Sequence, residues 1–292
     1  MGTRLAALLT LAALGGPSLA VEAPAGLGPR TSWSTALAAE APDLRRRAAQ
    51  ALGRLPRLTE AESAALLRAL DDAEPRVRLE AAIGLAGRGP SARIVGLLVV
   101  AEPTPAVVAA LAREAAGTPA ASEALVVLLG QRSEAEEVWQ WGLPGLVPRA
   151  RLDARIPPLL LRGVNHPSHR VRRVAVGGLG ALLDRPEVRA ALTKPTAEDP
   201  HPDVRAAACD AWAQATDPTW LPKATLLRAA LDPVASVRSA ALAALDPLRQ
   251  EVDVDDLVRQ AFQTDQDPTV RAVAERILGR ATAADLPPRK GF

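Results

Sequence analysis

The stretches HPDVRAAA (residues 201–208), VASVRSAA (234–241) and DPTVRAVA (267–274) decide the fold, because all three are variants of one pattern. Their central valines, Val204, Val237 and Val270, are 33 residues apart. Stepping back along the chain at nearly the same spacing gives further anchors at Val171, Val138, Val107, Val77 and Leu44. A short pattern that returns in register is typical of a repeat array, so we predict about eight units with no other domain beside them.

Each unit has room for a pair of helices. In the last unit, apolar residues recur at helical spacing between Val254 and Ala261. Pro268 then opens a second helix, since proline in a first turn loses no hydrogen bond, and Gly279 is expected to end it. Apolar residues make up 48% of the chain but aromatic ones only 2%, so Ala, Leu and Val must fill the core. This composition favours an all-α fold.

An aspartate precedes several of the Val-Arg pairs at constant spacing. The spacing resembles that of the HEAT repeat family, in the short bacterial form of the phycobilin-lyase type, over residues 31–280 or so. The resemblance implies antiparallel helix pairs stacked into an α-solenoid with a curved superhelix. It also implies a structural ladder between neighbouring repeats, with the aspartate in the turn and the arginine at the start of the second helix. The ladder residues are Asp72, Arg78, Asp199, Arg205, Asp232, Arg238, Asp265 and Arg271.

The fourth unit fits the pattern worst. Trp139 stands where the arginine is expected and Trp141 follows, while glycines and prolines at 142, 144, 145 and 148 are expected to interrupt the second helix. An exposed pair of indoles beside a broken helix is a candidate partner anchor, because tryptophan is enriched in interface hot spots. The alternative is that both rings fill the space left by a short helix. Trp212 and Cys209 fall at core positions of their unit and are predicted to be buried.

The histidines and arginines of the fifth and sixth units form a second candidate surface. His166, His169 and His201 lie in equivalent turns, but turn residues bind metal only if three or four ligands converge, and the spacing matches no zinc pattern. We therefore predict no metal and no cofactor. His169, Arg172 and Arg173 are added to Trp139 and Trp141 as candidate partner contacts, with ordinary solvated surface as the alternative.

The N-terminus predicts export. Arg4, an apolar run over residues 5–14 and small residues before position 21 are typical of a cleaved secretory signal. We expect a signal peptide at 1–20, a flexible lead at 21–30, the repeat solenoid at 31–280 and a C-terminal tail at 281–292. No apolar run in the mature chain reaches the length of a membrane span. The predicted location is periplasmic or secreted.

Function is inferred from architecture. The sequence contains no phosphate loop, nucleophile elbow or Cys and His nucleophile pair, so we predict no enzyme activity. The 35 Lys and Arg nearly balance the 33 Asp and Glu, which argues against nucleic acid as partner. We expect a non-catalytic scaffold or adaptor that binds another protein. A place as a subunit in a larger envelope-associated or membrane-associated assembly is compatible with this role. A chromophore-lyase-like enzyme subunit and a HEAT-fold nucleic-acid-binding protein are the alternatives, and export argues against both.

Overall fold

The computed structural model describes residues 29–131 and 135–284, and all regular structure within these residues is helical. The chain forms two compact units, Met1–Ala101 and Glu102–Phe292. The predicted signal peptide and most of the predicted lead and tail lie outside the described residues. Inside them, no helix is long and apolar enough to cross a membrane.

The first unit consists of two helix pairs, α1 with α2 and α3 with α4, followed by α5. Within it, α2 packs against α4, α3 against α4, and α5 against α4. Its elements are η2 (Arg30–Ser32), α1 (Trp33–Ala36), α2 (Pro42–Gly53), α3 (Glu60–Ala69), α4 (Pro75–Leu85) and α5 (Ser91–Val99).

In the first unit α1 and α3 are the first helices of their repeats, and α2 and α4 are the second helices. The second unit continues this alternation. The first helices of its repeats are α7 (Pro119–Gln131), α9 (Ile156–Gly163), α11 (Pro186–Glu198), α13 (Lys223–Ala229) and α15 (Val252–Thr264). The second helices are α6 (Pro105–Ala115), α8 (Glu136–Leu146), α10 (His169–Leu179), α12 (Pro202–Trp212), α14 (Ala235–Leu245) and α16 (Pro268–Ala284). Short 3-10 turns lie between them: η3 (Val147–Arg149), η4 (Gly180–Leu182), η5 (Pro218–Trp220) and η6 (Asp246–Leu248).

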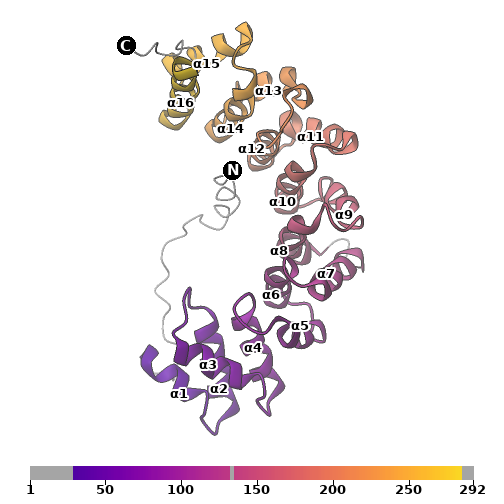
Figure 1. Ribbon diagram of the computed structural model, residues 1–292, viewed down its shortest axis with the longest axis vertical. Helices are drawn as coiled ribbons and strands as arrows, with labels where there is room; N and C mark the ends of the chain where they lie inside the picture. Colours follow the sequence, from indigo (N-terminus) through magenta and orange to yellow (C-terminus); the bar gives the residue numbers. More distant parts are fainter. Residues whose placement is uncertain (1–28, 132–134, 285–292) are drawn as a thin grey trace, which may run out of the picture. The chain divides into compact units, whose positions relative to one another are not determined.

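The second helices of this unit form one continuous row. Each packs on the next, from α6 through α8, α10, α12 and α14 to α16, and the first helices form the other row (Figure 1). Within this unit the row of second helices lies on the inner side of the bend. Exposed side chains on the solvent-facing side of this row are therefore presented together along successive repeats.

The repeat register is confirmed by burial. Every predicted anchor falls in a second helix, and each anchoring valine from Val77 to Val270 is at most 4% exposed, while Leu44 is half-buried. Many second helices begin with a proline at their first turn, as predicted. Trp212 and Cys209 are buried, also as predicted, and the Trp212 indole N–H donates to Thr196 Oγ1 at 3.0 Å.

Several predicted element boundaries were wrong. Helix α8 is not interrupted: it runs through Pro144 to Leu146 and has the same 11 residues as α4, α10 and α12. Its glycines serve packing instead, since a Cβ added to Gly145 would lie 2.5 Å from Cα of Ala112 in α6. Helix α16 continues past Gly279 to Ala284, and Arg30, assigned to the lead, lies in η2.

Candidate functional site

A repeated Arg–Asp contact connects neighbouring repeats. In each case the arginine follows the anchor residue of one repeat, and the aspartate lies 27 residues later, in the turn before the second helix of the next repeat. Nε and Nη2 of the guanidinium donate to the two carboxylate oxygens, with N–O distances from 2.7 to 3.0 Å. We call each such contact a rung; the rungs are Arg45–Asp72, Arg172–Asp199, Arg205–Asp232 and Arg238–Asp265.

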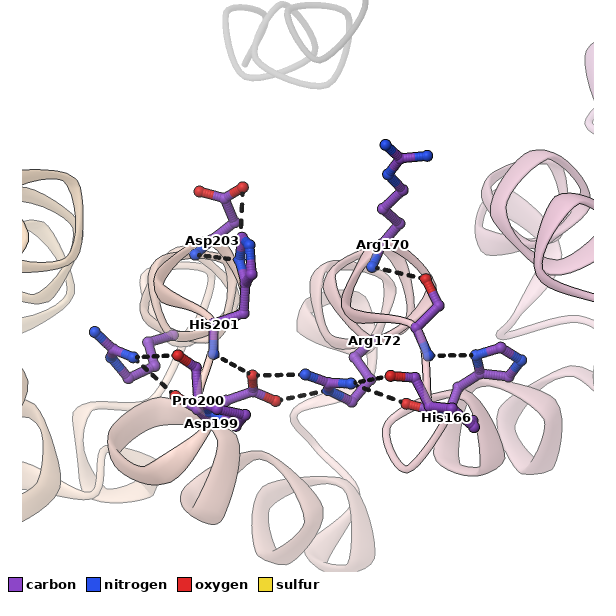
Figure 2. A network of polar contacts seen from close by, with 10 residues as sticks. His166, Arg170, Arg172, Asp199, Pro200, His201 and Asp203 are labelled. Carbon is purple, nitrogen blue, oxygen red and sulfur yellow. Dashed lines mark hydrogen bonds and ion pairs between the residues drawn. The ribbon is translucent and has the colours of Figure 1, made fainter.

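Each rung is fixed at both ends by backbone groups. Nη1 of Arg172 donates to the carbonyl oxygens of His166 and Pro167 in its own turn, while Oδ1 of Asp199 accepts the backbone N–H of His201 (Figure 2). The same pattern recurs at the other rungs. Two-point pairing of this kind fixes geometry as well as charge. The ladder therefore holds helix, turn and next repeat in one register.

The rung carboxylates are held in their charged form. Hydrogen bonds from Arg238 hold the pKa of Asp265 below its ordinary value, and those from Arg45 do the same for Asp72. At Asp199 burial works in the opposite direction, but the hydrogen bonds from Arg172 and the backbone outweigh it, so the pKa is again lowered. These aspartates act as permanent anions rather than proton donors.

The fourth repeat has an aromatic contact at the place of a rung. Trp139 occupies the arginine position of α8, and His166 lies 27 residues later, at the aspartate position. Their ring centroids are 5.9 Å apart, and the Arg162 guanidinium lies 4.5 Å from the Trp139 ring. Nδ1 of His166 accepts the backbone N–H of Ser168, as the aspartates do in their own turns. We call the Trp139–His166 contact the aromatic rung.

This arrangement corrects two of the candidate partner contacts. Trp139 is fully buried, so its indole fills the core and is not on a surface. Arg172 is committed to Asp199 and to its own turn, with a side chain only 14% exposed. Arg78 and Arg271, predicted as ladder residues, donate to carbonyls of their own turns; Asp72 and Asp265 pair with the arginine of the preceding repeat instead.

His169 is also engaged with a neighbouring repeat. Its ring stacks on that of His201 with centroids 3.8 Å apart and planes 9° from parallel. Nδ1 of His201 accepts the backbone N–H of Asp203, which caps α12. Within the described residues, no group of three or more His, Cys, Asp or Glu side chains could hold a metal ion.

The remaining predicted contacts, Trp141 and Arg173, lie on the outward surface of the second helices. Trp141 is 47% exposed, and Arg173 is exposed in the next helix of the row. Small residues lie in the helices next to them. Ala109 is in α6, the helix before that of Trp141 in the row, and a Cβ added to Gly177 of α10 meets no atom within 4 Å. We call this surface the Trp141 face; it comprises Ala109, Arg113, Glu137, Trp141, Arg170, Arg173 and Gly177.

Two shallow hollows lie on the opposite row, on either side of α11. One, of about 530 Å³, lies between α11 and α13, and the other, of about 540 Å³, lies between α11 and the turn before α10. Lys194 and Glu198 line both of them. Glu198 pairs with Arg228 at 3.6 Å. These hollows are open to solvent, unlike the enclosed, apolar pockets in which small ligands usually bind.

Sequence reasoning missed Arg45, Arg172 and His166 as members of the ladder. The signal was present in the chain, because the 27-residue offset joins Arg45 to Asp72 and Trp139 to His166, just as it joins Arg205 to Asp232. The six-residue spacing within one repeat identified the correct aspartates. It does not show which arginine each aspartate binds, because that spacing describes one turn, whereas the ion pair joins two neighbouring repeats.

Comparisons with known proteins agree with this architecture. The family model for HEAT repeats matches residues 156–245 and 196–279. An engineered protein of known structure is similar, with 19% identity and a TM-score of 0.55 over 90% of this chain and 80% of that one. The Escherichia coli protein YibA shares 14% identity with a TM-score of 0.53, over 86% and 93%.

A third similar structure is Kap121p bound to RanGTP, with 13% identity and a TM-score of 0.50. The match covers 84% of this chain but only 37% of Kap121p. At these identities the similarity shows a shared fold. A search of curated proteins gave no significant match.

Proposed function

We propose that this chain, which belongs to the HEAT repeat family, is an exported, non-catalytic scaffold that binds another protein through the Trp141 face. The observation that carries the proposal is the exposure of Trp141. Its indole is 47% exposed on a rigid helix, whereas Trp139 and Trp212 are buried. An aromatic side chain held on a rigid element loses little conformational entropy on binding, which is why such residues dominate interface energetics.

The chemistry of the other candidate groups supports a binding role. The rung aspartates are held as anions by arginines, so they are poor general acids. Burial, together with nearby carboxylates, raises the pKa of the Cys209 thiol to about 12, which keeps it protonated and unreactive. A scaffold needs neither group. The two alternatives, a chromophore-lyase-like subunit and a nucleic-acid-binding protein, gain no support from these residues.

Site-specific photocrosslinking in the native cells tests this function. A photoreactive phenylalanine analogue, which keeps an aromatic ring at the position, replaces Trp141 in one variant and Phe262 in another. Phe262 is a similarly exposed aromatic residue (42%) on α15, away from the Trp141 face. We expect a discrete protein adduct from position 141 and none from position 262. The proposal is wrong if position 141 gives no adduct or if both positions give the same adducts.

Export is tested on the same material. Sequencing the N-terminus of the protein purified from native cells should give a chain that begins at Val21, because cleavage after Ala20 follows the small-residue pattern of signal processing. Recovery of a chain that retains residues 1–20 from the cytoplasmic fraction would contradict the proposed location.

A further inference from the structure

We infer that the partner segment bound by the Trp141 face is acidic and apolar: a protein segment with carboxylates on either side of a large apolar side chain. The inference rests on the proposed function and names the chemistry of its partner. It starts from the charges on the Trp141 face. Arg113 of α6 and Arg170 and Arg173 of α10 are exposed there, while α8 presents the carboxylates of Glu137 and of Glu136, which lies beside Arg170.

The position of these charges relative to the indole matters. Trp141 is the third residue after its anchor; Arg113 is the sixth after the anchor of α6, and Arg173 is the second after that of α10. Because α6, α8 and α10 pack side by side, the indole lies in a row between two helices that each present an arginine. A segment crossing the row meets cation, aromatic ring and cation in turn.

Arg173 differs from the arginines of the ladder. The ladder guanidiniums are largely buried and each is committed to a carboxylate. Arg173 is exposed, and among the described residues it makes neither an ion pair nor a side-chain hydrogen bond. A guanidinium in this state can form a two-point contact with a carboxylate from outside without breaking an existing one. Arg170, by contrast, lies 3.8 Å from Glu136.

Small residues give the partner room. A Cβ added to Gly177 meets nothing within 4 Å. Ala109 in α6 and Ala206 in α12 are small residues at the second position after their anchors, where α10 has Arg173. The indole therefore stands above its surroundings, and an apolar side chain can pack along its edge. On α12 the exposed charges are the carboxylates of Asp203 and Asp210, which repel an acidic segment and limit it to α6, α8 and α10.

A selection from a random peptide library tests the inference without assuming a sequence. The purified mature chain is the bait, and synthetic copies of the enriched peptides are titrated against variants by fluorescence anisotropy. We expect enrichment of peptides in which Asp or Glu flank Leu, Phe or Trp. Their affinity should fall as salt is raised, because exposed charge pairs are screened.

Variants locate the binding. Trp141→Ala and Arg173→Glu should each weaken an enriched peptide by about tenfold or more, as expected for an anchor and for a reversed charge. Phe262→Ala and Lys194→Glu are the matched controls, since both residues are exposed but lie on first helices. These two should change the affinity by less than about twofold.

Each other outcome overturns the inference. It is wrong if the library yields no peptide, if basic peptides are enriched, or if the Arg173 and Lys194 variants behave alike. The crosslinking experiment separates this failure from failure of the proposed function. If position 141 gives an adduct but the library selects basic or uncharged peptides, the scaffold function stands and the acidic partner segment is rejected. If position 141 gives no adduct, the scaffold function itself is rejected.

Discussion

The guanidinium of Arg205 in α12 and the carboxylate of Asp232 in the turn before α14 bind each other through two hydrogen bonds of 2.7 and 3.0 Å. The two residues are 27 positions apart and belong to neighbouring repeats. Both side chains are largely buried, with 11% and 9% of their surface exposed. Removing one partner of a buried, two-point ion pair destabilises a protein, because the other charge is left in the interior without its counter-charge.

We therefore expect Arg205→Ala to lower the free energy of unfolding by about 2 kcal/mol, because a hydrogen-bonded buried carboxylate loses its partner. Asp232→Ala should cost a similar amount. In the double variant the two losses should not add, since the same contact is removed twice. Urea denaturation followed by circular dichroism measures all three.

The matched control for this cycle is the exposed pair Arg228–Glu198, whose closest atoms are 3.6 Å apart. Arg228→Ala should cost less than about 1 kcal/mol, as exposed ion pairs usually do. Equal losses of unfolding free energy in Arg205→Ala and Arg228→Ala would show that a rung contributes no more to stability than an exposed ion pair does.

The aromatic rung offers a swap experiment. Trp139→Arg alone places an uncompensated charge in the core and should cost about 3–5 kcal/mol. Adding His166→Asp supplies the carboxylate that the other rungs use at this position, so the double variant should be more stable than Trp139→Arg by itself. Thermal unfolding of the two variants makes the comparison. If the second substitution lowers stability further, the Trp139 and His166 positions are not equivalent to those of Arg172 and Asp199.

Two glycines in neighbouring helices should respond to alanine in opposite directions. In Gly145→Ala the new Cβ would lie 2.5 Å from the backbone of Ala112, so we expect a loss of roughly 1–3 kcal/mol from overpacking. In Gly177→Ala the new Cβ meets nothing within 4 Å, and the better helix propensity of alanine should raise stability by up to about 1 kcal/mol. Urea midpoints decide the matter; a loss in both variants would contradict the packing described for α8 on α6.

Acid should weaken the first unit through Glu62. Hydrogen bonds from Arg30 lower the pKa of Glu62 from 4.5 to about 2, with the Thr59 backbone N–H and hydroxyl adding to the effect. Because the pKa of the folded state is the lower one, the stabilisation is fully present above pH 4.5 and is lost as the pH falls toward 2.

The test compares the wild type with Glu62→Gln at neutral pH and at pH values within that window. The wild type should lose more stability on acidification than the variant, since glutamine does not titrate. Parallel pH profiles for the two proteins would show that the Arg30–Glu62 pair carries none of the acid sensitivity.

Much of the fold could be predicted because the anchors are local signals with a constant spacing. Val77 and Val270 mark buried positions that any helix pair must fill, and the prolines before them mark helix starts. Pro144 and Gly145 misled the prediction, since their effect depends on a neighbouring helix. Gly145 is required by the close approach of Ala112, a contact that no property of α8 alone reveals.

The candidate site was predictable only in part, for the same reason. Trp139 and Trp141 are two positions apart on one helix, so they point to different sides of it. Which of them is buried depends on where α9 places Arg162 and where the following turn places His166. Arg172 and Arg173 divide in the same way, one into the ladder and the other onto the surface. Sequence identified the residues, and the packing of the next repeat sorted them.

The ladder also gives the array a polarity along the chain. Each rung arginine from α10 onward is oriented by carbonyls of its own turn, and its carboxylate comes from the repeat that follows. That carboxylate is oriented in the same way, because it accepts a backbone N–H of its own turn. Both halves of a rung are therefore held in place by local bonds, so adding a repeat to the array requires no rearrangement of the turn that receives it.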